Sequence, residues 1–356
     1  MKMDLTIILD YIIISIIASL TVNSFLRNYA KKYKILVDIP DTSRKFHKRP
    51  TPLTGGVGIL IALLISGKLY IDLNNLTGYV PEFTFQLMVV SIPLVILFLI
   101  DDFKELKPLF RILIQVALTI YMIQSTGVYL ETLGNLFGPG EINLGIFSMP
   151  ITVFCVVGIM NAFNMMDGIN GLCSGCAMIT LMLIGFFSGL IYDSMLVLII
   201  GSMIGFVIFN LGIFGKQNGV FLGDSGSNLV GFWVAWIAIY ASQSKIYSIE
   251  PMTILWFVAI PLLDCIGLIF TRTINGISWA TAGRDHIHHK LMKKFSPQST
   301  LLIILTTTLL TGIFGIIVEI IFTSYISTLL FFVYAILYYL FTGYFWKKVF
   351  FGDATN

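Results

Sequence analysis

The sequence predicts an all-α integral membrane protein. Its 356 residues are 57% hydrophobic and 12% charged, whereas soluble domains carry about 25% charged residues. The mean hydropathy of +0.90 agrees with this prediction. A chain of this size has too few polar residues to cover a soluble core. Disorder, a disulfide-rich secreted scaffold and an ordinary soluble enzyme are therefore excluded.

About eleven apolar runs are each long enough for a transmembrane helix, which needs about 20 residues. The run at 148–166 ends in a polar stretch. The run at 253–271 contains Pro261 and Asp264, and we expect it to be kinked or broken because proline cannot donate a backbone hydrogen bond. In chain order the runs are 5–26, 54–71, 84–100, 111–129, 148–166, 172–191, 195–213, 226–243, 253–271, 299–321 and 325–346.

Basic residues predict how these helices are oriented. Of the 22 lysines and arginines, all except Lys2, Lys68 and Lys245 follow an odd-numbered helix. Because cytoplasmic loops carry an excess of lysine and arginine, we expect the N-terminus outside and the C-terminus in the cytoplasm. A single polytopic domain is predicted over residues 1–356, with cytoplasmic loops near 27–53, 101–111, 166–172, 214–226 and 272–298.

Two adjacent carboxylates, Asp101 and Asp102, directly follow an apolar run. Their negative charges repel each other, and a bound cation would relieve that repulsion. A solvated helix end is the alternative interpretation.

A second polar cluster lies at the end of the run 148–166. Asn161, Asn164 and Asp167 recur at i, i+3 and i+6, so they share one face if the helix continues through them. Gly168 and Gly171 would let a ligand approach the backbone closely. The pattern favours a ligand-binding helix end, and a hydrogen-bonded seam between helices is the alternative.

A third carboxylate, Asp224, lies in the sequence Gly-Asp-Ser-Gly-Ser at the start of a predicted helix. Helix N-termini attract phosphate groups, and an aspartate there can also be a plain N-cap. A metal ligand and an N-cap both fit this position.

Three of the four histidines, His286, His288 and His289, closely follow Arg284. No second ligand group such as cysteine lies nearby, which disfavours a zinc site. Imidazole and guanidinium groups fit contact with phosphate better.

A basic stretch at 44–50 is followed by Gly55, Gly56 and Gly58. Basic residues beside a membrane mostly fix topology and contact anionic lipid. Substrate binding is the alternative for this stretch.

Together these clusters predict one reaction class. The carboxylates suit Mg²⁺ or Mn²⁺ rather than a soft metal, and the basic side chains suit phosphates. All lie at predicted cytoplasmic helix ends, beside lipid. The sequence therefore predicts magnesium-assisted phosphoryl transfer from a soluble donor to a lipid acceptor. The net charge of +3 does not suggest a nucleic-acid partner.

The motif order D-D, N-x-x-N-x-x-D-G, G-D-x-G-S and H-x-H-H resembles the polyprenyl-phosphate N-acetylhexosamine-1-phosphate transferases, which form glycosyltransferase family 4. The sequences NAFNMMDG and RDHIHH look most like the WecA type, which begins O-antigen or related glycans. The resemblance implies transfer of N-acetylhexosamine-1-phosphate, in this type GlcNAc-1-phosphate, from a UDP-sugar to undecaprenyl phosphate, with release of UMP. It also implies Mg²⁺ (or Mn²⁺) and a multi-pass protein of the bacterial inner membrane. The exact UDP-sugar, an MraY-type activity and a homodimer are left open.

The resemblance also implies roles for individual residues. Asp224 is the expected metal ligand, assisted by Asn164 at the metal or the pyrophosphate. Asp101 is expected to act on the lipid phosphate, either by ligating the metal or by accepting a proton, with support from Asp102.

The remaining residues of the resemblance are expected to bind substrate. Asn161 and Asp167 look like nucleotide-side residues, and Arg111 corresponds to a basic residue at the pyrophosphate. The segment that clamps phosphates and sugar is expected to consist of Arg284, His286, His288 and His289.

One position departs from many bacterial members of the family. Asn170 stands where they have aspartate, and an amide cannot act as a base, so we assign it no proton-transfer role. The lipid phosphate is already largely ionised at neutral pH and needs little base catalysis. We therefore favour its direct attack on the donor over a covalent aspartyl-phosphate intermediate.

Two other classes of function share some of these features. In a transporter, Asp264 and Glu319 would form a proton path within the helices. The collection of polar residues at one membrane face disfavours this interpretation. An inactive scaffold would keep the fold without the reaction, and the intact carboxylates and histidines argue against it.

Overall fold

A computed structural model describes residues 5–40, 49–74, 81–104, 106–247, 249–278, 283 and 285–345. The described chain is almost entirely helical. Its α-helices are α1 (Leu5–Tyr33), α2 (Gly55–Leu73), α3 (Glu82–Lys104), α4 (Pro108–Thr126), α5 (Ser148–Met166), α6 (Leu172–Ser188), α7 (Ser194–Asn210), α8 (Gly223–Gln243), α9 (Pro251–Phe257), α10 (Ala259–Ile274), α11 (Ile287–Met292), α12 (Pro297–Ile321) and α13 (Ser324–Leu340).

Shorter elements connect these helices. They are the strands β1 (Val37–Asp38) and β2 (Thr51–Pro52), the 3₁₀ turns η1 (Gly145–Phe147), η2 (Leu190–Tyr192) and η3 (Lys216–Asn218), and the π-helical turn η4 (Phe341–Phe345). The two strands pair antiparallel, with Val37 opposite Pro52. This small hairpin lies within a segment that the sequence predicted only as a polar loop.

The predicted fold class is confirmed: this is an all-α membrane protein. Among the described residues, seven helices have the length and composition to cross a membrane, and an eighth is added if the bent pair α9 and α10 is one span. The apolar helices α6 and α7 are shorter. Each of the eleven predicted runs overlaps one helix or the bent pair. The number of spans and their orientation stay predictions.

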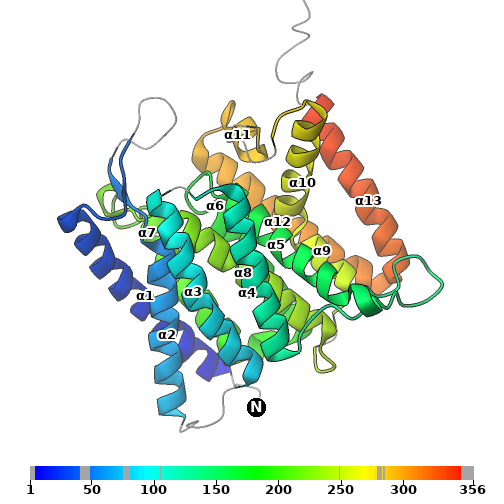
Figure 1. The fold of residues 1–356 in the computed structure, drawn as a ribbon, viewed down its shortest axis with the longest axis horizontal. Coiled ribbons are helices and arrows are strands. Elements are labelled where there is room, and N and C mark those ends of the chain that lie inside the picture. Colours follow the sequence, from blue (N-terminus) through cyan, green and yellow to red (C-terminus); the bar gives the residue numbers. More distant parts are fainter. Residues whose placement is uncertain are drawn as a thin grey trace, which may run out of the picture.

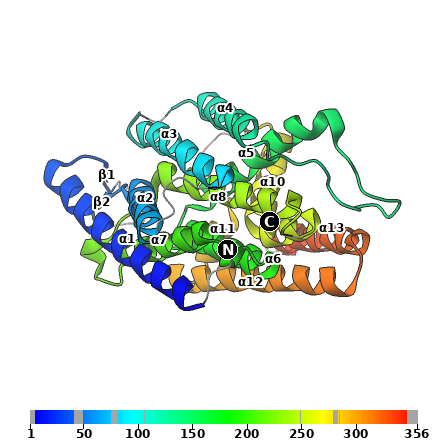
Figure 2. The same ribbon diagram turned by 90° about the horizontal axis from the view of Figure 1, so that it is seen from below.

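Helix α8 lies in the middle of the bundle, in contact with α2, α3, α5 and α6 (Figure 1, Figure 2). It is apolar on every side after its first turn, as expected of a helix buried on all faces. Trp233, Trp236 and Phe232 are fully buried within it. The buried indole of Trp233 donates to Ser91 Oγ of α3 at 2.9 Å. This packing fixes the direction of α8 and therefore the position of its first turn.

Small residues let α1 pack closely against α7. Gly201 and Gly205 face Ser15 and Ser19, and a Cβ on either glycine would press against those serine side chains. Ser19 Oγ also donates to the carbonyl of Ser202 at 2.6 Å. Close approach of helix backbones through small residues is a common packing mode in membranes.

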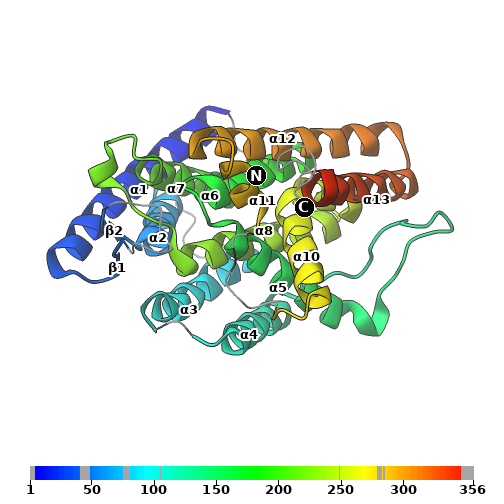
Figure 3. The same cartoon turned by 90° about the horizontal axis from the view of Figure 1, so that it is seen from above.

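The predicted break in the run 253–271 is confirmed. Helix α9 ends at Phe257, α10 begins at Ala259, and the two helix axes differ by 80°. Pro261 has no N–H to donate to the Phe257 carbonyl. That carbonyl instead accepts a hydrogen bond from Thr180 Oγ1 at 2.9 Å. The bend turns α10 toward α11, and Figure 3 shows these two helices beside the centre of the bundle.

Candidate functional site

The first turn of α8 is held by a carboxylate from α3. The backbone N–H groups of Asp224 and Ser225 donate to Asp102 at 2.7 and 3.2 Å. Asp102 therefore caps α8 from another helix, satisfying N–H groups that have no partner within their own helix. Gly223 has a φ of +75°, which favours glycine, and Asp102 fills the space where a Cβ would be. Because Asp102 is the cap, the side chain of Asp224 is available for other contacts.

Arg111, in the first turn of α4, joins two carboxylates. Its Nε lies 2.8 Å from Asp101 Oδ2, and one terminal nitrogen lies 3.4 Å from Asp224 Oδ2. Asp101 is 1% exposed and also accepts from the Leu106 N–H at 2.6 Å. The side chain of Asp224 is 36% exposed. Asp101 is thus fixed by its neighbours, while Asp224 can reach a ligand.

Asn164, in the last turn of α5, completes this cluster. Its amide nitrogen donates to Asp224 Oδ1 at 3.0 Å and to Ser227 Oγ at 2.8 Å. The predicted common face of Asn161, Asn164 and Asp167 is only partly correct. Helix α5 ends at Met166, and Asp167 is its C-cap, with φ −78° and ψ 56°. Asp167 therefore lies in the turn beyond the helix.

Asp167 has part of its side chain at the surface, although the chain is densely packed around its carboxyl group. Desolvation by the surrounding chain, together with the negative charges of Asp224 and then Asp102, raises its pKa to about 7. A carboxyl group that is hard to ionise in the free protein gains most from a nearby cation. Asn170, in the same connection, is exposed.

Two polar residues that the sequence analysis missed lie one helical turn further into the bundle than this cluster. Gln115 Nε2 donates to Asn228 Oδ1 at 2.7 Å, and its Oε1 accepts from Asn161 at 2.8 Å. Gln115 and Asn228 are each 1% exposed. Each lies four residues after a charged residue of the cluster, Arg111 or Asp224, on the same helix face. This i, i+4 spacing in apolar helices was the available signal. Asn161 therefore connects helices here, as the alternative interpretation of its motif proposed.

The histidine segment begins a short helix rather than lying in a loop. His288 and His289 are in α11, and His286 immediately precedes it. Asp264 of α10 accepts from the His286 Nδ1–H at 2.7 Å and from the Ile287 N–H at 2.8 Å. Asp264 is 8% exposed and His286 7%. Asp264 is therefore a positioning residue for the segment.

His288 is 1% exposed and packs directly over Gly168. A Cβ at Gly168 would overlap Nε2 of this histidine. Burial, together with the neighbouring imidazoles of His289 and His286, lowers the pKa of His288 to about 3, so the ring is neutral at physiological pH. Neither ring nitrogen has a hydrogen-bond partner in the described part of the chain. An unmade hydrogen bond of a buried group costs about 1–3 kcal/mol.

His289 is half-buried, with its ring centroid 4.2 Å from that of His288. The structure thus brings the three predicted histidines together and joins them to the turn that contains Asp167. Arg284 lies outside the described residues, and so does most of the basic stretch 44–50.

The glycines after the basic stretch pack against the segment before Asp224. The N–H groups of Gly55 and Gly56 donate to the carbonyls of Phe221 and Leu222 at 3.0 and 3.1 Å. A Cβ on Gly56 would overlap the backbone of Gly226. These glycines are therefore explained by close packing of α2 against α8.

The side chains around Asp224 fit part of the coordination shell of a magnesium ion. In the described ranges, no group of three His, Cys, Asp or Glu side chains is arranged to hold a metal by itself. Mg²⁺ is usually bound by one or two carboxylates and completes its shell with water and substrate phosphates. The partly exposed carboxylate of Asp224, next to Asp101 and Asn164, fits that incomplete kind of site.

These observations define a class: a multi-pass membrane protein with a polar site at one end of its helices. The family model of glycosyl transferase family 4 matches residues 57–242. The chain therefore belongs to glycosyl transferase family 4, and the resemblance found in the sequence is confirmed.

Individual relatives agree with the family assignment. Two undecaprenyl-phosphate alpha-N-acetylglucosaminyl 1-phosphate transferases, from Yersinia pestis and Escherichia coli strain K12, are each 35% identical to this chain. They align with 80% and 83% of this chain and with 77% and 79% of their own lengths. The enzyme of the same name from Haemophilus influenzae is 33% identical over 72% of each chain.

Proposed function

We propose that the protein transfers GlcNAc-1-phosphate from UDP-GlcNAc to undecaprenyl phosphate. An oxygen of the lipid phosphate attacks the phosphorus that bears the sugar. The bond between the two donor phosphates breaks, and UMP leaves with the electron pair. The relatives described above are named for this transfer.

The observation that carries the proposal is the position of Arg111 between Asp101 and Asp224, with Asn164 bound to the same Asp224 carboxylate. Catalysis of phosphoryl transfer consists largely of positioning and charge stabilisation. A fixed cation beside an accessible carboxylate can bind a pyrophosphate on one side and a metal ion on the other.

The histidine segment supports the same proposal. Both nitrogens of His288 lack partners although the ring is buried beside the turn that contains Asp167. The chain covers both nitrogens, so the phosphates or the sugar of the donor would supply the missing partners once the turn at Gly168 moves on binding. Asp264 fixes the orientation of the His286 ring through Nδ1, which leaves Nε2 for contact with a ligand.

We propose Mg²⁺, or Mn²⁺ in its place, as the cofactor. Asp224, Asp101 and Asn164 would hold it, and when bound it would neutralise charge on the leaving UMP phosphate. The protein groups have separate roles: Asp102 fixes the first turn of α8, and Arg111 binds the pyrophosphate. We retain direct attack by the lipid phosphate, because that phosphate is already largely ionised at neutral pH and needs little base catalysis.

We further propose eleven membrane spans, an outside N-terminus and a site at the cytoplasmic face of a bacterial inner membrane. The support is the charge asymmetry of the sequence, because nineteen of the 22 basic residues fall on one side of the predicted topology. The product would enter O-antigen or a related surface glycan.

The test uses the purified full-length protein in detergent. Radiolabelled UDP-GlcNAc is incubated with undecaprenyl phosphate and Mg²⁺, and label is followed into an organic extract. We expect transfer that is abolished by EDTA and restored by excess Mg²⁺. UMP should form in equal amount.

A folded protein that transfers no label from UDP-GlcNAc would contradict the proposed donor. If UDP-GalNAc or another UDP-sugar were used instead, the reaction class would stand with a different sugar. Failure with all of them would favour an inactive scaffold. The transporter alternative has lost support, because Asp264 binds His286 and Glu319 accepts from the Glu250 N–H at 3.4 Å.

A further inference from the structure

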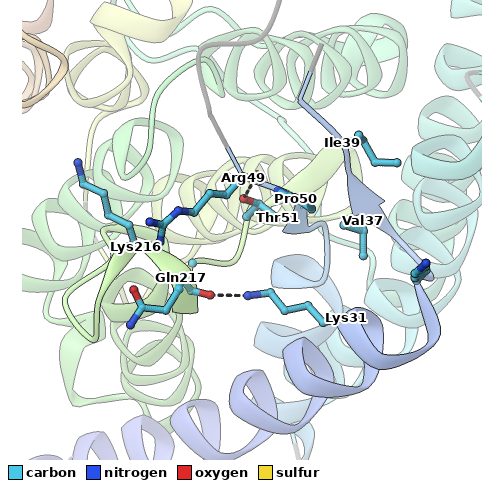
Figure 4. A pocket seen from close by; sticks show the side chains of 10 residues that line it. Lys31, Val37, Ile39, Arg49, Pro50, Thr51, Lys216 and Gln217 are labelled. Atoms are coloured by element: carbon cyan, nitrogen blue, oxygen red, sulfur yellow. Dashed lines mark hydrogen bonds between the residues drawn. The ribbon is translucent and has the colours of Figure 1, made fainter. Parts of the chain in front are cut away.

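A pocket of about 560 Å³ lies between the end of α1, the β1–β2 hairpin and η3 (Figure 4). Its volume falls in the range of about 300–1,000 Å³ that small-molecule sites occupy. The pocket is lined by Lys31, Lys34, Val37, Ile39, Arg49, Pro50, Thr51, Lys216, Gln217 and Gly219. Four of these residues are cations, and none is acidic.

These cations are not neutralised within the described chain. Lys31 donates to the backbone carbonyl of Gln217, which carries no charge. Lys34, Arg49 and Lys216 form no ion pair among the described residues. Asp38, between Val37 and Ile39, is not among the residues that line the pocket. An anion would be attracted by these uncompensated positive charges.

The backbone around the pocket has an unusual conformation. Lys34 and Leu36 have φ values of 54° and 52°, a left-handed region that residues other than glycine rarely adopt. The strain is held by hydrogen bonds from the Ile35 N–H to Ala30 O at 3.1 Å and from the Leu53 N–H to Leu36 O at 2.8 Å. At Lys34 this conformation is the common way in which a helix ends, here the end of α1. The turn brings Lys34 to the wall of the pocket.

The surroundings indicate where the anion comes from. Ile39, in the wall of the pocket, is 67% exposed. On α1, Phe25, Tyr29 and Tyr33 are exposed by 66%, 50% and 52%. Exposed aromatic rings near the end of a membrane helix mark the interface between hydrocarbon and water. The pocket therefore offers cations to a phosphate and an apolar edge to acyl chains.

We propose that this pocket binds the head group of an anionic membrane phospholipid. The phosphate contacts Lys34, Arg49 and Lys216, and the acyl chains leave past Ile39. Figure 4 shows Lys31 directed toward Gln217 of η3 and Arg49 extending from the hairpin toward the same element. The bound lipid would join the hairpin to η3. A hydrogen bond already connects the same two parts of the chain, because the Phe221 N–H, five residues after Lys216, donates to Pro52 O at 2.8 Å. The site is distinct from the Asp224 cluster and does not depend on the proposed reaction.

The test measures binding of short-chain phosphatidylglycerol to the full-length protein in neutral detergent by native mass spectrometry. Phosphatidylcholine of the same chain length and free glycerol 1-phosphate are the comparison ligands. Wild-type protein should bind phosphatidylglycerol in preference to both. The variant K34Q/R49Q/K216Q should lose affinity by about a hundredfold, and Lys216→Gln alone by about fivefold, since each basic group near anionic lipid contributes about that factor.

The matched control is K32Q/K293Q/K294Q, which removes three exposed cations outside the pocket and should bind as wild type does. Thermal unfolding in phosphatidylcholine nanodiscs checks that each variant is folded. Equal binding by wild type and the pocket variant would overturn the proposal. Competition by glycerol 1-phosphate as strong as that by the lipid would also overturn it. A higher KM for the sugar donor in the pocket variant, measured in phosphatidylcholine alone, would also overturn the proposal. It would mean that the pocket binds the sugar donor and not a lipid.

Discussion

The cluster around Arg111 and the pocket beside α1 differ in whether their positive charges are paired with carboxylates. Arg111 is bound by two carboxylates, Asp101 and Asp224, and is part of a hydrogen-bonded network. Lys34 and Lys216, in the pocket beside α1, have no acidic partner within the described chain. The side chains of the cluster are already held in place without a ligand. Such preorganisation is what stabilises the charge that develops in a transition state. The pocket is incomplete without an anion.

The segment from Gly219 to Gly226 belongs to both regions. Its beginning lines the pocket, and its end contains Asp224. This segment donates a hydrogen bond to Pro52 O and accepts hydrogen bonds from the Gly55 and Gly56 N–H groups, which connects it to the hairpin and to α2. A ligand in one region is therefore separated from the other by only a few backbone hydrogen bonds.

Replacement of Asp224 by asparagine is expected to have the largest effect. The amide preserves the size of the side chain but removes the accessible charge next to Arg111. Turnover should fall by about a hundredfold to a thousandfold, the usual effect of losing one group that stabilises charge in a transition state. Phosphatidylglycerol binding at the pocket should not change. Asp72→Asn, which alters an exposed ion pair with Lys68, is the control in the same transfer assay.

Arg111→Lys should reduce transfer by about tenfold to a hundredfold. Lysine keeps the charge but cannot contact two carboxylates with one planar group, so a charge-assisted hydrogen bond is lost. Arg27→Lys, which changes an arginine that lies over the ring of Phe209, should retain activity. Equal losses in the two variants would mean that the network around Asp224 has no special role.

Asp264→Asn tests whether the histidine segment is positioned from α10. The amide can still accept from the Ile287 N–H, but its NH₂ group would face the Nδ1–H of His286. We expect the donor KM to rise by about tenfold with a smaller change in kcat, because misplaced binding groups lose ground-state contacts. Asp193→Asn is the matched control, since Asp193 accepts from the Met195 N–H in the same capping role at α7. A fall in unfolding temperature with unchanged KM would show that Asp264 is only structural.

The smallest of these effects is expected for Gly168→Ala. Its Cβ would overlap Nε2 of His288, and the ring would have to move. Transfer should fall by about fivefold to tenfold, in line with the cost of overpacking a buried site. Gly158→Ala on α5 adds a Cβ with no atom within 4 Å and should leave transfer unchanged. Equal transfer rates for the Gly168→Ala and Gly158→Ala variants would show that transfer does not depend on the position of the His288 ring.

Local patterns in the sequence pointed to side chains that the structure brings together. The pairs and spacings of Asp101, Asn164 and Asp224 marked the helix ends that meet. The sequence could not assign Asp102, because whether a carboxylate binds metal or caps a helix depends on which N–H groups the fold brings to it. Asp264 was read as a residue deep in a helix, and only the bend between α9 and α10 explains its contact with His286.

Composition and hydropathy by themselves determined the fold class, because a chain this apolar must satisfy its backbone hydrogen bonds within helices in a bilayer. Motif order determined the family, and proline chemistry determined that the run containing Pro261 is broken. Only the tertiary structure decided that Gln115 and Asn228 are partners, that Asp167 lies beyond its helix, and that four cations surround one pocket. Those relationships join residues far apart in the chain, and they depend on how helices pack rather than on any local pattern.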